Sequence, residues 1–272
     1  MNKKYKSILI ILSLLVIILI IILVFGKDDK IIPVLDDNIS KVDSPLIVEN
    51  SYETKTLNEN DPYVKFDIKY PQFKQVDNSF NENISNLIKE QIKDTKEVSS
   101  ENWQARYDTQ MEGENIGKYP KTDDEKFYLY SDFNIIQSNP YFISFILTYG
   151  AYTGGAHGYE AKVSFNYDVL NKKVLMLKDV FSPSFNYLEY LSKESRDYLY
   201  KEYAEVKNGE EGDENMKDYF DGIKEMIDMG TEKKEENFET FTFTKEKIKI
   251  YFSQYQVGPY AIGMPEVEFY RK

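Results

Sequence analysis

The chain of 272 residues contains a single histidine, His157, in the glycine-rich stretch Tyr152–Glu160. A hydrolase of the Ser-His-Asp type would have to use this imidazole as its general base. The sequence holds no Gly-x-Ser-x-Gly turn, which presents the nucleophilic serine in many such enzymes. Nucleophilic hydrolysis is therefore disfavoured.

Metal-assisted and acid–base chemistry have equally little support. The chain has no cysteine, so a zinc site built on His157 would need Asp or Glu for its other ligands. Glycoside hydrolysis needs only two carboxylates roughly 5–10 Å apart, and 46 acidic residues are compatible with such a pair without indicating one. We expect a protein that is not an enzyme and that binds no metal and no cofactor.

The composition narrows the choice of partner. The formal net charge is −12, and three of the 34 basic residues lie within the first 26 positions, which contain no acid. The remainder is thus more acidic still, which argues against nucleic acid as a partner because phosphate binding needs a basic face. The 23 tyrosines reflect either strand propensity or a surface that suits protein or glycan contact.

The N-terminal residues predict a membrane anchor. Residues 8–25 are apolar apart from Ser13, and a helix of that length, about 27 Å, just crosses the hydrocarbon layer. Residues 1–7 carry three lysines and are expected in the cytoplasm, which places the body of this single-pass membrane protein outside the cell. The alternative is a signal peptide that signal peptidase cuts after Gly26, giving a secreted protein.

Regular secondary structure is expected to begin near residue 62. Alternating apolar residues predict a strand over 64–70 that ends at Pro71. Asp77 or Asn78 is then expected to cap a helix with apolar residues at helical spacing. Residues 94–126 are rich in Asp, Glu, Lys and Gly, so we expect mostly loop there.

Strands dominate the middle of the chain. A strand is predicted at 127–137, and another at 141–152 is nearly continuous in apolar and aromatic residues, as in a central strand. Alternation resumes at Ala161 and predicts a hairpin that turns at Asn171-Lys172 and returns through Val174–Leu177.

Two amphipathic helices follow the hairpin. The first is expected to be capped by Ser184, and the second is expected to end at Gly230. Strands are predicted again at 239–253 and 266–270. Because strands and helices do not alternate as parallel βαβ units, we predict an α+β fold with an antiparallel sheet and packed helices, preceded by one transmembrane helix.

The expected organisation has five parts. They are a cytoplasmic tail (1–7), a transmembrane anchor (8–25), a polar stalk (26–60), an N-terminal subdomain (61–150) and a C-terminal subdomain with the Gly-Gly-Ala-His-Gly turn (151–272).

Two segments are candidates for partner binding. The first is the turn that carries Tyr152, Thr153 and His157; a purely structural role, with His157 bonded to nearby backbone, is the alternative. The second is the loop that carries Pro259 and Tyr260 between two strands, where a rigid sheet would present an aromatic anchor. Here the alternative is that Tyr260 packs inward.

Four stretches carry a resemblance to known proteins. They are Tyr149–Gly158, Ser164–Asp168, Leu177–Phe181 and Ile250–Gly263. Together they resemble the extracytoplasmic domain pair of RsiV-type anti-sigma factors and PdaC-type peptidoglycan deacetylases, and the similarity runs from about Tyr52 to Tyr270.

The resemblance implies a binding or sensing domain at the cell envelope. RsiV-type proteins use this domain pair to bind lysozyme, which exposes them to signal peptidase and frees a sigma factor. A sigma-binding segment and a deacetylase domain are not recognisable in this chain, so neither of those activities is expected. The expected ligand is a lysozyme-like protein or peptidoglycan, and the alternative is an accessory domain of peptidoglycan modification.

Overall fold

The computed structural model describes residues 51–110, 116–204 and 214–272. The expected tail, the expected anchor and most of the expected stalk lie outside these residues. Within the described ranges, no helix is long and apolar enough to cross a membrane. These ranges form an α+β fold with sheets that are mostly antiparallel, which confirms the expected fold class.

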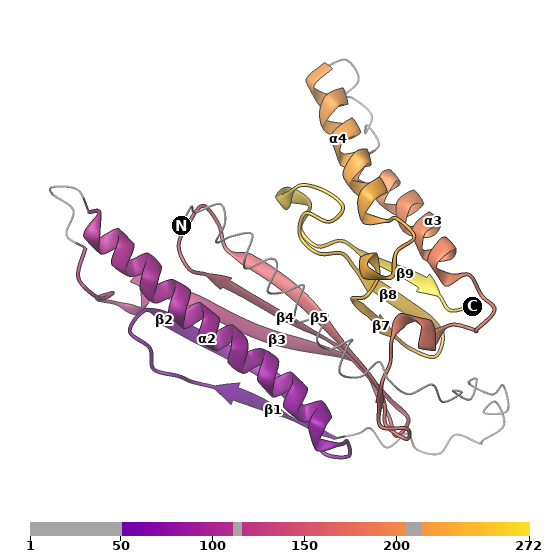
Figure 1. The fold of residues 1–272 in the computed structure, drawn as a ribbon, viewed down its shortest axis with the longest axis horizontal. Coiled ribbons are helices and arrows are strands. Elements are labelled where there is room, and N and C mark those ends of the chain that lie inside the picture. Colours follow the sequence, from indigo (N-terminus) through magenta and orange to yellow (C-terminus); the bar gives the residue numbers. More distant parts are fainter. Residues whose placement is uncertain (1–50, 111–115, 205–213) are drawn as a thin grey trace. The chain divides into compact units, whose positions relative to one another are not determined.

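The larger sheet has six strands in the described residues (Figure 1). In spatial order they are β1 (Tyr52–Leu57), β2 (Val64–Phe73), β3 (Phe127–Ser138), β4 (Phe142–Tyr152), β5 (Tyr159–Asp168) and β6 (Lys173–Val174). All neighbours are antiparallel except β2 and β3, which run parallel. The expected antiparallel sheet thus contains one parallel pair, because the long helix α2 (Asn78–Asp108) crosses over between β2 and β3.

Helix α2 covers one face of this sheet (Figure 1). Asp77 caps it as expected, its carboxylate accepting a hydrogen bond from the Ser79 amide at 3.2 Å. The expected loop over 94–126 was wrong for its first part, because the helix continues to Asp108. Its buried stripe passes through Thr95, Ser99 and Trp103 at helical spacing, and the small polar side chains conceal the apolar periodicity.

Two further boundaries differ from expectation. Strand β2 continues through Pro71, which lies opposite Thr54 of β1. The pairing of β2 with β3 stops at Ile68, so at Pro71 the strand has a neighbour on one side only and the missing N–H costs no ladder bond. The turn at Asn171-Lys172 forms, but the returning arm is the short β6, and Leu177 begins a 3-10 helix.

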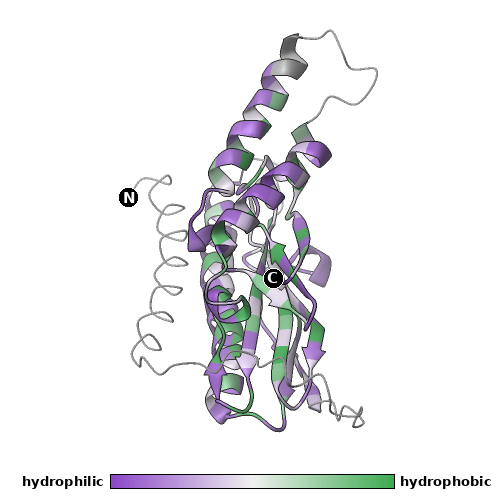
Figure 2. Ribbon diagram, turned by 90° about the vertical axis from the view of Figure 1, so that its right-hand side faces the viewer, coloured by the Kyte–Doolittle hydropathy of each residue, from purple (hydrophilic) through white to green (hydrophobic). Residues whose placement is uncertain are grey.

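The second sheet is separate from the first. It contains β7 (Phe241–Phe243), β8 (Lys247–Tyr251) and β9 (Glu266–Tyr270), all antiparallel. The helices α3 (Tyr187–Leu199) and α4 (Glu214–Gly230) share its hydrophobic core. Bands of hydrophilic and hydrophobic residues alternate along these two helices, as expected for amphipathic helices (Figure 2).

The ends of α3 and α4 were partly predicted. Asn186 caps α3 in place of Ser184, accepting a hydrogen bond from the Glu189 amide at 3.3 Å. Helix α4 ends at Gly230 as expected.

Side chains of the larger sheet form hydrogen bonds with strand β7 of the smaller sheet. Asn166 of β5 is buried; its amide nitrogen donates to the Phe241 carbonyl at 2.8 Å, and its oxygen accepts from the Ser144 hydroxyl at 2.7 Å. The Ser144 hydroxyl in turn accepts from the Phe243 amide at 3.0 Å, and Ser164 accepts from the Phe241 amide at 3.1 Å. These bonds fix β7 against the face of the large sheet that is opposite to α2.

Replacing Asn166 with alanine is expected to lower the free energy of unfolding by about 1–3 kcal/mol, because two buried partners lose a hydrogen bond. Denaturant unfolding of the full chain measures this. Asn134→Ala, in strand β3 of the same sheet and exposed, is the matched control and should change stability by less than about 0.5 kcal/mol. Equal effects of the two substitutions would contradict this role for Asn166.

The expected division between residues 61–150 and 151–272 stays a prediction. Strand β4 runs across residue 150 and pairs with β5 over its whole length, so the larger sheet contains residues from both ranges.

Candidate binding surface

The turn between β4 and β5 has the geometry that its glycines predict. Gly154 and Gly155 have φ angles of +94° and +129°, in the region that favours glycine. His157 is exposed, and its Nδ1 lies 2.8 Å from the carbonyl oxygen of Gly158. The histidine therefore does bond to nearby backbone, and its side chain stays exposed.

The loop after β8 carries the second candidate segment. Tyr260 begins a 3-10 turn directly after Pro259, and 38% of its surface is exposed, so this side chain does not pack into the core. Pro259 is half-buried. Tyr255, in the same loop, has a φ angle of +65°, which is uncommon for a residue with a bulky side chain. The side-chain Nε2 of Gln256 donates to the Gly230 carbonyl at 3.1 Å, which ties the loop to the end of α4.

The turn and the loop meet at His157 and Tyr260. Their rings stack with centroids 4.2 Å apart and planes inclined by 29°. The Tyr260 hydroxyl donates to the Gly158 carbonyl at 3.4 Å, and the Tyr255 hydroxyl lies 3.5 Å from the second ring nitrogen of His157. Two segments that are far apart in the sequence thus form one surface.

Tyr152 and Thr153 are placed differently. The Tyr152 hydroxyl donates to the Gly155 carbonyl at 3.1 Å, and its ring lies 6.1 Å from that of Tyr128. The Thr153 carbonyl accepts from the side chain of Asn102 at 2.6 Å, which ties the start of the turn to α2. Thr153 therefore belongs to the support of the turn, whereas Tyr152 extends the aromatic surface.

Sequence reasoning missed three residues of this surface, Tyr128, Tyr130 and Glu160. In β3, Phe127 and Leu129 are buried, and the intervening tyrosines point to the opposite face. Tyr128 is 44% exposed, and the Tyr130 hydroxyl donates a hydrogen bond to the carboxylate of Glu160. Tyrosine at alternate positions of a half-buried strand was the signal that could have located them.

The electrostatics of this surface favour hydrogen-bonding contacts. Burial, the hydrogen bond to Glu160 and the charge of that carboxylate raise the pKa of Tyr130 well above its usual range, and the nearby hydroxyls of Tyr128 and Tyr260 add to this. Tyr130 therefore keeps its proton and remains a donor. We call Tyr128, Tyr130, Tyr152, His157, Glu160 and Tyr260 the tyrosine–histidine surface.

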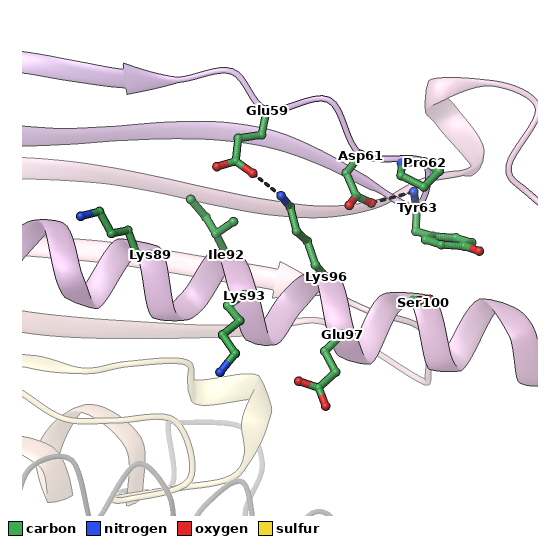
Figure 3. Close-up of a pocket in the computed structure, with 10 residues that line it drawn as sticks. All are labelled: Glu59, Asp61, Pro62, Tyr63, Lys89, Ile92, Lys93, Lys96, Glu97 and Ser100. Atoms are coloured by element: carbon green, nitrogen blue, oxygen red, sulfur yellow. Dashed lines mark hydrogen bonds and ion pairs between the residues drawn. The ribbon is translucent and has the colours of Figure 1, made fainter.

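A shallow groove lies elsewhere, between the segment before β2 and helix α2 (Figure 3). Its volume is about 660 Å³, and its lining mixes lysines with acids. Lys96 reaches from α2 to the carboxylate of Glu59, and Asp61 accepts from the Tyr63 amide at 2.8 Å (Figure 3). These acids are already paired within the protein, so the groove offers no concentrated charge of one sign to a ligand. Within the described ranges, no three His, Cys, Asp or Glu side chains gather as a metal-binding group.

Two protein families match separate parts of the chain. Residues 57–160 match the family described as deacetylase PdaC, and residues 178–272 match the family described as protein of unknown function DUF3298. Two separate parts of the chain are therefore similar to these two families, and the expected resemblance to PdaC-type proteins is confirmed. The resemblance to RsiV-type proteins stays a prediction.

One curated relative is the peptidoglycan-N-acetylmuramic acid deacetylase PdaC of Bacillus subtilis, which is 25% identical over 217 residues. The match covers 78% of this chain but 38% of that relative, so the chain spans less than half of the relative's length.

Two solved structures of DUF3298 proteins are also similar. One, from Bacteroides fragilis, has a TM-score of 0.54 at 18% identity, covering 81% of this chain and 90% of that chain. The other, from Pseudomonas aeruginosa, has a TM-score of 0.41 at 14% identity, covering 80% and 86%. The first shows that the fold is shared.

Proposed function

We propose that this protein is a non-catalytic binding domain of the cell envelope and that its ligand is the glycan of peptidoglycan. The observation that carries the proposal is the tyrosine–histidine surface, which two distant segments assemble around the stacked rings of His157 and Tyr260. Tyrosines provide large, rigid contact area at low cost in conformational entropy, and their hydroxyls can bond to polar ligands.

The comparisons support the wall as the place of action. The PdaC-type domain is named after a deacetylase, and the curated relative is named for peptidoglycan N-acetylmuramic acid. This chain matches less than half of that relative, so we propose that the shared part contributes binding rather than deacetylation.

A basic protein such as a lysozyme-like hydrolase is the second candidate ligand. The formal net charge of −12 would attract such a partner and raise its rate of association at low salt. The RsiV-type resemblance supports the same ligand, and such a protein would act as a sensor rather than as a wall anchor.

Binding of the full chain to isolated peptidoglycan and to immobilised lysozyme distinguishes the candidates. We expect retention on peptidoglycan that persists at 0.5 M NaCl, because stacking and neutral hydrogen bonds are weakly screened, whereas attraction between net charges is lost. Lysozyme binding that disappears with salt, without retention on peptidoglycan, would favour the second candidate. Release of acetate or muropeptides from the wall would contradict a non-catalytic role.

We further propose that residues 8–25 anchor the protein and that its body is extracytoplasmic. The full chain should fractionate with membranes, and protease added to intact cells should degrade the body. If signal peptidase cuts after Gly26, the product should start at Lys27 and appear in the medium. Recovery of the intact chain from the cytosol would overturn this placement.

A further inference from the structure

Gly150 allows the ring of Tyr130 to lie across strand β4. The two residues are direct neighbours in the β3–β4 register. A Cβ atom at Gly150 would lie 2.7 Å from the Tyr130 ring carbon Cε1 and 2.8 Å from its hydroxyl oxygen. The ring therefore occupies the space that a side chain at position 150 would fill. On the next strand, Glu160 lies opposite Gly150 and accepts the Tyr130 hydrogen bond.

Two more tyrosines continue this aromatic layer. The ring of Tyr128 lies 6.4 Å from that of Tyr130, with the planes inclined by 34°. It also lies 6.1 Å from the ring of Tyr152, with an inclination of 30°. Tyr152 is the register partner of Tyr128. The ring of Tyr128 is thus near both of the others, and Tyr128 is the most exposed of the three.

Polar groups lie beside the three tyrosine rings. Glu160 lies next to Tyr130, and the stacked pair of His157 and Tyr260 approaches from the neighbouring loop. The carboxylate is an acceptor, and the tyrosine hydroxyls are donors and acceptors.

We propose that Tyr128, Tyr130 and Tyr152 form a stacking platform for successive pyranose rings of a β-1,4-linked N-acetylhexosamine glycan. This inference rests on the proposed function and specifies its ligand and contact residues. A pyranose ring presents C–H bonds on its faces, and these meet the electron-rich face of an aromatic ring favourably. The distance between neighbouring tyrosine rings is comparable to the length of one hexose unit, so a linear chain can contact more than one ring.

The carboxylate of Glu160 gives the platform its preference for the acetamido sugar. An acetamide N–H can donate to the free lone pairs of this carboxylate, which already accepts from Tyr130. A glucan with the same linkage has a hydroxyl at this position, which can also donate to the carboxylate but lacks the flat methyl-bearing group that can pack against a tyrosine ring. The platform should therefore bind the N-acetylglucosamine polymer in preference to cellulose-type chains.

Calorimetric titration of the full chain with the soluble N-acetylglucosamine hexamer tests the platform. We expect binding that weakens about tenfold in Tyr128→Ala and about tenfold in Tyr130→Ala, since each loses one stacked ring. Tyr128→Phe, which keeps the ring, should stay within about threefold of the unaltered chain. Cellohexaose, which keeps the backbone of the glycan without its acetamides, should bind at least about fivefold more weakly.

Tyr219→Ala is the matched control, because this tyrosine is 47% exposed on α4, outside the tyrosine–histidine surface. It should bind the hexamer like the unaltered chain. Folding of every variant is checked by the fluorescence of Trp103, the only tryptophan, which is buried. Variants with unaltered Trp103 emission are compared by affinity, and an alanine variant with altered emission is replaced by the leucine variant of the same tyrosine, which removes the ring but keeps an apolar side chain.

The possible outcomes distinguish failure of the stacking platform from failure of the proposed glycan-binding function. If peptidoglycan and the hexamer bind but Tyr128→Ala and Tyr130→Ala leave affinity unchanged, the platform is wrong and the glycan-binding function stands. If peptidoglycan binds but the hexamer does not, a different part of the wall is the ligand and the platform is again overturned. If neither binds and lysozyme does, glycan binding itself fails.

Discussion

A chain that carries both His157→Ala and Tyr260→Ala should bind isolated peptidoglycan about 100-fold more weakly than the unaltered chain, a loss of about 2.7 kcal/mol. The two rings stack on each other and present one continuous contact, so removing them together deletes a central aromatic anchor of the surface. The Tyr260 hydroxyl also links the loop to the Gly158 carbonyl, and its loss frees both segments to move apart. A ligand would then have to bring the turn and the loop back into position when it binds.

The double substitution is more informative than either single one. Because the rings are in contact, the effect of one substitution depends on the other, and the single losses are not expected to add. We expect each single variant to lose about 1–3 kcal/mol of binding free energy. A sum of single losses that exceeds the double loss would indicate that His157 and Tyr260 act as one unit.

The matched control replaces two exposed aromatic residues elsewhere, Tyr198 of α3 and Tyr219 of α4, with alanine. Both double variants should melt within a few degrees of the unaltered chain, because all four side chains are exposed. Retention on peptidoglycan, measured as a binding isotherm, should fall in the first variant only. A large fall in melting temperature with unchanged affinity per folded molecule would instead assign His157 and Tyr260 to the scaffold.

The local patterns of the sequence predicted most elements but not their partners. Alternation located β2 and β5, a nearly continuous apolar run located β4, and the glycine pair located the turn before His157. The stacking of His157 on Tyr260 joins two segments through the tertiary fold, and no pattern within either segment reports it. The exposure of Tyr260, left open by the sequence, follows from the 3-10 turn that Pro259 begins.

Two errors have a common physical cause. The second half of α2 was expected to be loop because Thr95 and Ser99 occupy core positions, where a small polar side chain allows close packing but gives no apolar signal. The docking of β7 on the larger sheet was not predicted, because its hydrogen bonds come from side chains such as Asn166 and not from a continuing ladder. Tertiary contacts of polar residues are invisible to hydrophobic periodicity.

The largest change in stability is expected at Gly230. In Gly230→Ala, the new Cβ atom would lie 2.2 Å from the carbonyl oxygen of Gln256 and 2.8 Å from the side chain of Val257. The Gln256 carbonyl oxygen belongs to the backbone and cannot rotate away as a side chain can, so the end of α4 and the loop after β8 must move apart. We expect the free energy of unfolding to fall by about 3 kcal/mol and the melting temperature by roughly 6–12 °C.

Gly222→Ala in the same helix is the control, and it is expected to raise the free energy of unfolding instead of lowering it. A Cβ atom there would have no neighbour within 4 Å, so alanine only removes the helix penalty of glycine. This should raise stability by about 0.5–1 kcal/mol and leave peptidoglycan affinity unchanged.

The two glycine variants also test how the binding loop is held. Gln256 bonds to the Gly230 carbonyl, and the same loop carries Tyr260, so displacing it from α4 should disturb the tyrosine–histidine surface. We therefore expect Gly230→Ala to weaken peptidoglycan binding even below its melting temperature, when all molecules are folded. Loss of stability with full affinity would show that Tyr260 keeps its position without the α4 contact, and that the stack with His157 alone is enough to hold it.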